Sequence, residues 1–195
     1  LTREVNMRNP FSFAAFPSWK RVFEDQSKEA QAAVYRDVNF RNRFRDDLKR
    51  PASFGNWERI TVHEVHSPGL KHLEGRTVAD IAAERGVDGV DALLDITLAD
   101  DLQNEFTMQS FNTRVDRMTE ILRNKDMLLG LGDGGAHLDM LCDSGYPTYV
   151  LGTWVRERKA LSLEEAVRRM TSDPADFFGI RDRGRLAPGL AADLT

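Results

Sequence analysis

The residues best suited to chemistry in this chain lie in a glycine-rich stretch around Asp133. An apolar run over residues 127–131 is long enough for one buried strand, and it leads directly into Gly132 and Asp133. A carboxylate at the mouth of a buried strand is costly unless it is paired or bound to a cation. Asp133 is therefore the leading candidate for catalysis or metal binding, and capping of the next helix is the alternative structural explanation.

The residues that follow Asp133 suit a binding loop. Gly134 and Gly135 have no side chains, so a ligand could approach their backbone closely. His137 could hydrogen-bond to Asp133 or to a substrate held by the same loop. The alternatives are that the two glycines form a simple turn and that a backbone group satisfies the histidine.

Other residues that could do chemistry are weaker candidates. His63 and His66 are three residues apart in a segment with strand periodicity, so their side chains point to opposite faces and do not form a metal pair. Their spacing also differs from the four-residue offset of the His-Glu-x-x-His zinc motif. Cys142 is better explained as a buried thiol than as a nucleophile, since the sequence places only His137 near it.

The pattern of apolar residues predicts an α/β protein in which strands alternate with helices. The alternating pattern of residues 59–66 predicts a half-buried strand, and residues 1–7 give a weaker indication of one. The nearly continuous apolar run at 127–131 suits a strand of a parallel sheet that is covered on both sides. Helical segments are expected at about 25–49, 77–85, from 88 to about 98, 115–122, 162–171 and from 173 to Gly179, with short extended pieces after residue 180.

Several helix ends are marked by local signals. Thr77 with Asp80 and Ser162 with Glu165 have the spacing of an N-terminal capping box, and Asp88 can cap the helix that follows it. Glycines mark the opposite ends, because Gly86 and Gly179 can adopt the left-handed conformation found just past a helix.

Two segments have alternative explanations. Phe11, Phe13, Phe16 and Trp19 are expected to form a buried aromatic cluster, the alternative being the apolar wall of a substrate pocket. In the charged helix at 25–49, Val34, Val38 and Phe44 are expected to face inwards. The arginines between Arg36 and Arg50 have acids nearby, so they indicate a solvated face rather than a phosphate site.

Composition excludes several classes of protein. The chain has 195 residues, of which 41% are hydrophobic and 30% charged, as in soluble globular proteins. A net charge of -4 does not favour nucleic acid or an anionic membrane as a partner. A single cysteine rules out an internal disulfide and suits a reduced, cytoplasmic location. The chain begins with Leu1, and its last residues read as an interrupted strand, so we expect a piece of a longer protein.

Five segments in the last third of the chain carry a family signature, namely Gly132–His137, Gly152–Glu157, Leu161–Ala175, Phe178–Ile180 and Asp182–Leu194. Together they closely resemble the N-acyl-D-amino-acid deacylases (D-aminoacylases) of the amidohydrolase superfamily. Residues 76–82 and 91–95 also look like the helical insertion that this family carries before its last barrel strand.

The resemblance implies the carboxyl-terminal part of a (β/α)₈ TIM barrel, a fold of about 250 residues when complete. Residues 1–180 would form the last part of the barrel, with the insertion at about 10–125, and residues 181–195 would begin a small flanking β domain. The family binds one or two divalent ions, usually zinc, and most of the ligands would lie upstream of Leu1. Asp133 matches the aspartate that contacts the metal and acts as general base and acid. Gly134, Gly135 and His137 would then contact the substrate, a small N-acyl amino acid or related amide.

One departure from the family affects the choice of substrate. Some deacylases place basic residues soon after the Asp-Gly pair, whereas residues 138–141 here contain no cation. A guanidinium from elsewhere, such as that of Arg8, could hold a substrate carboxylate instead. Two further hypotheses remain open, namely a hydrolase of cyclic amides from the same superfamily and a non-catalytic α/β binding module.

Overall fold

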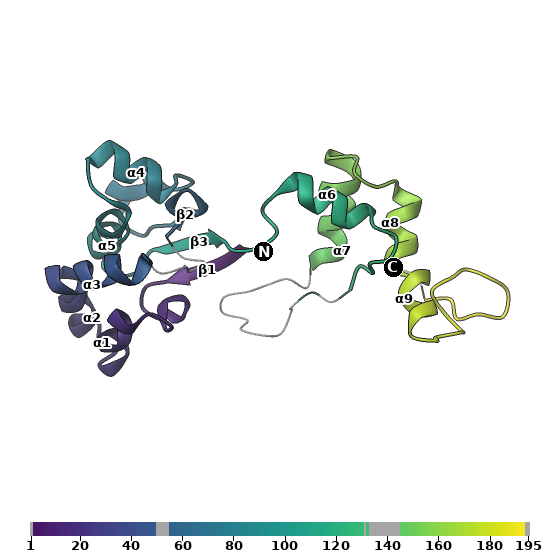
Figure 1. The fold of residues 1–195 in the computed structure, drawn as a ribbon, viewed down its shortest axis with the longest axis horizontal. Helices are drawn as coiled ribbons and strands as arrows, with labels where there is room; N and C mark the ends of the chain where they lie inside the picture. The colour runs from purple at the N-terminus through teal and green to yellow at the C-terminus, as the bar shows by residue number, and fades with distance from the viewer. Residues whose placement is uncertain (1, 50–54, 131, 133–144, 194–195) are drawn as a thin grey trace. The chain divides into compact units, whose positions relative to one another are not determined.

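The chain folds into two units, which Figure 1 shows with their helices and strands labelled. This computed structural model describes residues 2–49, 55–130, 132 and 145–193. The first unit comprises Leu1–Phe111 and the second Asn112–Thr195. We describe each unit by itself.

Three strands form an antiparallel sheet in the described part of the first unit, in the order β1-β3-β2. They are β1 (Thr2–Asn6), β2 (Ile60–Glu64) and β3 (Glu105–Gln109). The strands predicted at residues 1–7 and 59–66 are confirmed as β1 and β2. The sequence pattern missed β3, although this strand occupies the centre of the sheet. These strands run antiparallel, unlike the parallel strands of the predicted barrel.

Helices fill the connections between the strands of the first unit (Figure 1). Short 3₁₀ turns occur at Phe11–Phe13, Pro17–Trp19, Trp57–Arg59 and Pro68–Leu73. The α-helices are α1 (Lys20–Glu24), α2 (Lys28–Arg36), α3 (Val38–Leu48), α4 (Val78–Arg85) and α5 (Gly89–Ala99). The single helical segment expected at 25–49 is therefore two helices, which meet at Asp37.

The predicted caps of the first unit are confirmed. The Thr77 hydroxyl accepts a hydrogen bond from the Asp80 amide at 3.1 Å, and the Asp88 carboxylate accepts one from the Asp91 amide at 3.0 Å. Gly86 follows α4 with φ at 64°, the left-handed conformation that the helix end requires. These bonds join residues three apart, so the local sequence is enough to specify them.

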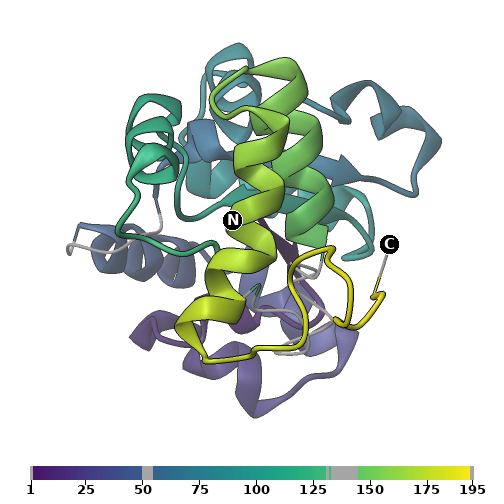
Figure 2. The ribbon, with the colours of Figure 1, turned by 90° about the vertical axis from the view of Figure 1, so that its right-hand side faces the viewer.

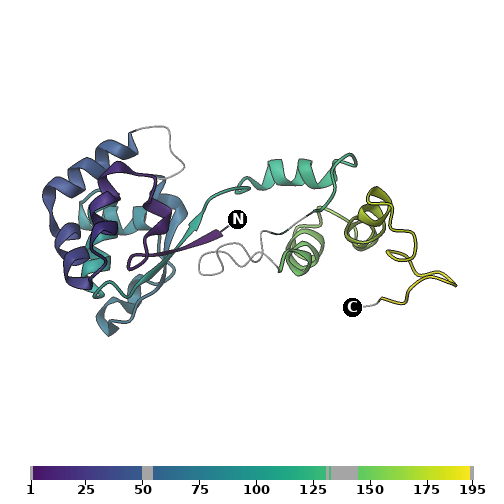
Figure 3. The same cartoon turned by 90° about the horizontal axis from the view of Figure 1, so that it is seen from below.

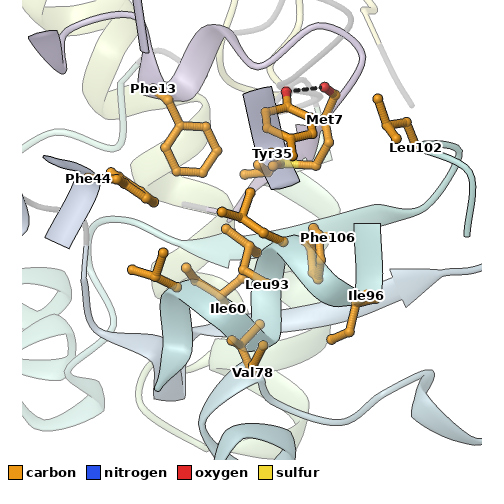
Figure 4. Close-up of a cluster of buried hydrophobic side chains, with 14 of the residues drawn as sticks. Met7, Phe13, Tyr35, Phe44, Ile60, Val78, Leu93, Ile96, Leu102 and Phe106 are labelled. Atoms are coloured by element: carbon orange, nitrogen blue, oxygen red, sulfur yellow. Dashed lines mark hydrogen bonds between the residues drawn. The ribbon is translucent and has the colours of Figure 1, made fainter. Parts of the chain in front are cut away.

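The core of the first unit contains the predicted aromatic cluster. The rings of Phe13 and Trp19 stack with their centroids 4.0 Å apart, and both residues are fully buried. Figure 4 shows Phe13 and Phe44 among the buried side chains, with the Tyr35 hydroxyl donating to the Met7 carbonyl at 2.8 Å.

Two residues predicted to be buried, one in the aromatic cluster and one in the helix at 25–49, lie outside the core. Phe11 is 49% exposed, and Val38 is 63% exposed, so the expectation that Val38 faces inwards is wrong. Val38 is the first residue of α3, directly after the Asp37 cap, where the chain has just turned away from α2. Val34 and Phe44 are buried as expected.

The described part of the second unit is helical, and Figures 2 and 3 show its helices in green and yellow from two further sides. Its helices are α6 (Val115–Arg123), α7 (Tyr146–Tyr149), a π-helix (Val150–Glu157), α8 (Leu163–Met170) and α9 (Ser172–Phe177). The predicted capping box of α8 is confirmed, because the Ser162 hydroxyl accepts from the Glu165 amide at 3.1 Å. Gly179 follows α9 with φ at 70°, also as predicted.

Two predictions about the second unit are wrong. Residues 127–130 form a bend and irregular chain rather than a buried strand, with Met127 44% exposed and Leu128 36% exposed. Residues 180–193 contain bends and turns instead of the expected β structure. A buried strand needs neighbouring strands to complete its hydrogen bonds. Residues 112–130, 132 and 145–193 contribute no strand that could pair with either segment.

None of the helices among the described residues combines the length and the apolar character needed to cross a membrane.

Candidate functional site

The predicted catalytic loop lies outside the described residues. Asp133, Gly134, Gly135 and His137 all fall within residues 133–144, as does Cys142. The described chain approaches this loop up to Gly130 and at Gly132, and it continues from Gly145. The flanking segments are therefore the part of the candidate site whose geometry can be described.

A buried arginine holds the segment that leads to the loop. Arg169 lies in the last turn of α8 and is only 2% exposed. Its Nη1 donates to the carbonyl oxygen of Leu122, and its Nη2 donates to the carbonyl oxygens of Met127 and, at 2.9 Å, Asn124. The last carbonyls of a helix lack partners within the helix and carry partial negative charge. Arg169 therefore supplies donors to the end of α6 and to the turn that follows it.

Two further contacts fix the same turn. The Arg123 Nε donates to the carbonyl oxygen of Ala160 at 2.9 Å, which ties the last residue of α6 to the chain just before α8. The Asn124 side chain accepts from the amide of Asp126 at 2.9 Å. Side chains of α6, α8 and the turn thus hold the path of the chain up to Met127.

On the other side of the loop, a π-helix is the main element. Helix α7 continues into this π-helix, where Val150 and Trp154 are buried against the core of the second unit. The guanidinium of Arg158 lies 5.4 Å from the centre of the Trp154 ring, within range of a cation–π interaction. π-Helical segments are rare and often occur at functional sites.

In the first unit, neither histidine of the 63–66 pair belongs to a metal-binding cluster. His63 and His66 are both exposed. No group of three or more His, Cys, Asp or Glu side chains within the described ranges is arranged to hold a metal ion. The residues described here therefore do not by themselves provide a metal centre.

Asp100 is the most deeply buried carboxylate near these histidines, with a side chain that is 0% exposed. It accepts hydrogen bonds from the His66 amide at 2.8 and 3.0 Å and from the Ser67 amide at 2.5 Å. Burial alone would raise the pKa of Asp100, but these hydrogen bonds outweigh it and hold the pKa below its ordinary value. The contacts anchor the loop after β2, which is a structural role.

Arg8, the residue suggested for a substrate carboxylate, already has partners in the protein. Its Nη1 donates to the side-chain oxygen of Gln31, and its Nη2 donates to the carbonyl oxygen of Gln26 at 3.2 Å. Gln31 is fully buried and returns a hydrogen bond to the Arg8 carbonyl at 3.1 Å. These acceptors are neutral, so the charge of Arg8 is not neutralised by them.

Two arginines of α3, Arg41 and Arg45, form ion pairs with α5 and its N-cap, so their charges are already neutralised within the protein. Arg41 donates to Asp91 at 2.8 Å and to Asp95 at 2.7 Å, and Arg45 contacts Asp88 and Asp91 at 2.6 Å. Burial disfavours the charged form of Arg41, yet its hydrogen bonds with the two aspartates raise its pKa above the ordinary value. The predicted solvated face is in part an interface between two helices.

Sequence reasoning did not single out Arg169. The sequence shows only that Arg169 lies three residues after Ala166, which places both on one face of the predicted helix; the structure shows that this face is buried at Ala166. An arginine on the buried face of a helix requires specific acceptors. The identity of those acceptors, on α6 and the following turn, could not be read from the spacing.

Comparison with known proteins identifies relatives over most of the chain. Residues 46–195 match the family described as "Amidohydrolase family". An N-acyl-D-glutamate deacylase of Alcaligenes xylosoxydans xylosoxydans is 37% identical over 123 residues, covering 62% of this chain and 23% of the relative. An uncharacterized protein of Mycobacterium tuberculosis is 32% identical over 193 residues, covering 89% of this chain and 31% of the relative. The chain thus spans less than a third of the length of these curated relatives.

A solved structure is also similar in sequence. It is an N-acyl-D-glutamate deacylase from Bordetella bronchiseptica, complexed with zinc and a phosphonate inhibitor that mimics the tetrahedral intermediate of the reaction. The two sequences are 30% identical, and the match covers 71% of this chain and 27% of that one with a TM-score of 0.38.

Proposed function

Since the chain belongs to the amidohydrolase family, we propose that the protein containing it hydrolyses a linear amide bond and removes the acyl group from N-acyl-D-amino acids. The observation that carries this proposal is the 37% identity over 123 residues with an N-acyl-D-glutamate deacylase. An N-acyl-D-aspartate deacylase of the same organism supports it, at 32% identity over 131 residues.

We propose Asp133 as the residue that moves protons in this reaction. An ionised carboxylate can take a proton from the attacking water and later give it to the departing amine. The sequence supports this assignment, because Asp133 lies in the Gly-Asp-Gly-Gly stretch that resembles the family's aspartate after the last barrel strand. Gly134, Gly135 and His137 are proposed to contact the substrate from the same loop.

The metal belongs to the proposal only as a cofactor of the whole protein. Zinc and a metal contact by Asp133 are expected from the family resemblance. The described residues do not fit a complete metal site, since no cluster of three or more suitable side chains occurs among them.

The family resemblance also assigns each part of the chain to a domain of the whole protein. We propose that residues up to 180 form the last part of a TIM barrel with an insertion at about 10–125, and that residues 181–195 begin a small β domain whose strands lie outside the bends and turns of residues 180–193. The amidohydrolase match to residues 46–195 supports this arrangement.

The test compares Asp133→Asn with Asp126→Asn in the full-length polypeptide that contains this chain. Asp126 is exposed and lies seven residues earlier, so it receives the same chemical change outside the proposed loop. We expect Asp133→Asn to lower kcat/KM by about 10²–10⁴-fold, the contribution typical of a general acid–base group. Asp126→Asn should stay within about twofold of the wild type.

The assay measures the release of free amino acid from N-acetyl derivatives of D-glutamate, D-aspartate and D-leucine and of their L-enantiomers, with a hydantoin and a dihydropyrimidine in parallel. Activity confined to the cyclic amides would replace the proposed substrate class. A folded Asp133→Asn variant with wild-type turnover would refute the proposed role of Asp133 in proton transfer.

A further inference from the structure

Arg169 differs in kind from the other arginines of the second unit. Its neighbour Arg168 has a side chain that is 52% exposed and lies 3.4 Å from the Asp173 carboxylate, an ordinary surface ion pair. Arg169 is 2% exposed, and its hydrogen-bond partners in the described chain are three backbone carbonyl oxygens. Burying a guanidinium is costly, so these carbonyls must compensate for the lost hydration.

The three carbonyls come from one short stretch of chain. Leu122 lies in the last turn of α6, Asn124 caps that helix, and Met127 lies in the turn beyond it. The planar guanidinium presents its donors in a fixed fork, so binding all three oxygens sets their relative positions. The stretch cannot change direction without breaking at least one charge-assisted hydrogen bond.

This stretch leads towards the residues to which the proposed function assigns chemistry. Only a few residues separate Met127 from Gly132. Met127 and Leu128 are substantially exposed, so packing of these two side chains does little to fix the path. Together with the Arg123–Ala160 hydrogen bond and the packing of Leu129 against the core, the three hydrogen bonds of Arg169 determine where the chain leaves α6.

We propose that Arg169 is a positioning residue for the reaction. Its guanidinium holds the carbonyls of Leu122, Asn124 and Met127 and thereby sets the direction from which the chain reaches Gly132. This inference rests on the proposed function, because it assigns Arg169 a role in that reaction. Arg169 does not contact substrate in this scheme and acts only through the backbone that it holds.

The experiment uses the full-length polypeptide with Arg169→Gln and Arg169→Lys, and with Arg168→Gln and Arg168→Lys as matched controls. The hydrolysis of N-acetyl-D-glutamate gives kcat and KM for each variant. Misplacing a catalytic group by about 1 Å can cost about a hundredfold in rate, so we expect Arg169→Gln to lower kcat by about that factor and leave KM within about twofold. Lysine keeps the charge but not the fork, and we expect partial rescue. The Arg168 variants should match the wild type.

Hydrogen exchange supplies a second readout that does not depend on activity. The Met127 amide donates to the Asn124 carbonyl, and the Asn124 amide donates to the Ile121 carbonyl. Both amides should exchange faster in Arg169→Gln and Arg169→Lys than in the Arg168 variants. A purely structural role would lower the melting temperature but leave kcat per folded molecule unchanged.

The outcomes separate the two proposals. An inactive wild type would overturn the proposed function together with the positioning role of Arg169 in that reaction, while the exchange data would still decide whether the guanidinium holds the backbone. An active wild type whose folded Arg169 variants keep full kcat, or show unchanged exchange at Asn124 and Met127, would overturn the inference alone. If Arg169→Gln does not fold, Arg169→Lys decides by the same criteria.

Discussion

A substitution at Asp100 tests how much one buried carboxylate contributes to the stability of the first unit. Its carboxylate is fully buried and accepts hydrogen bonds from the backbone amides of His66 and Ser67. In Asp100→Asn one oxygen remains to accept from both amides, but the charge is lost and an NH₂ group faces the His66 amide. Charge-assisted hydrogen bonds contribute about 1.5–3 kcal/mol each and neutral ones about 0.5–1.5 kcal/mol, so the change should cost about 2–3 kcal/mol of unfolding free energy.

The effect must depend on pH in a defined direction. The pKa of Asp100 is lowered in the folded state, so its stabilising contribution is present above the ordinary aspartate pKa and is lost as pH falls through the folded value. The difference between wild type and Asp100→Asn should therefore be largest near pH 7 and smaller near about pH 2.5, which lies below the ordinary aspartate pKa.

Urea unfolding monitored by tryptophan fluorescence measures this difference. The chain has three tryptophans, and a Trp154→Phe background leaves Trp19 and Trp57, both in the first unit, as reporters. Asp101→Asn is the matched control, because Asp101 is 64% exposed in its ion pair with Lys28 and exposed pairs contribute about 0–1 kcal/mol. A loss below about 0.5 kcal/mol at neutral pH, or an equal loss at both pH values, would refute the assigned role.

Two further substitutions test the packing of the helices in the first unit. Arg41 has a side chain that is 13% exposed and pairs with two aspartates of α5. We expect Arg41→Ala to lower the unfolding free energy measured in urea by about 2 kcal/mol. The control Arg43→Ala, at an exposed position of the same helix, should change it little. Equal losses for the two would contradict the ion-pair network. Gly89→Ala places a Cβ against the Trp57 ring, closer than van der Waals contact allows, so the ring must shift at a cost of about 1–3 kcal/mol, with altered Trp57 fluorescence. Gly69→Ala meets no atom within 4 Å and serves as its control, and a fluorescence spectrum of Gly89→Ala like that of the wild type would show that the ring had not moved.

The local sequence was sufficient to predict structure wherever the interacting groups are close along the chain. The caps formed by Thr77, Asp88 and Ser162 join residues three apart, and Gly86 adopts the left-handed conformation at its predicted place. The family resemblance is confirmed by the match to residues 46–195. It rests on motifs whose residue types and spacing are visible without a structure. The assignment of Asp133 has the same origin and stays a prediction.

The features that the sequence did not predict correctly depend on which helices and strands pack together. The apolar run at 127–130 satisfies the pattern of a buried strand, yet a strand forms only where neighbouring strands complete its hydrogen bonds, and the described part of its unit supplies none. Arg168 and Arg169 are indistinguishable in sequence, but one faces solvent and the other binds three carbonyls at the end of α6 and in the turn after it. Contacts between residues three apart are set by helix geometry, whereas contacts between residues more than forty apart exist only once the helices have packed.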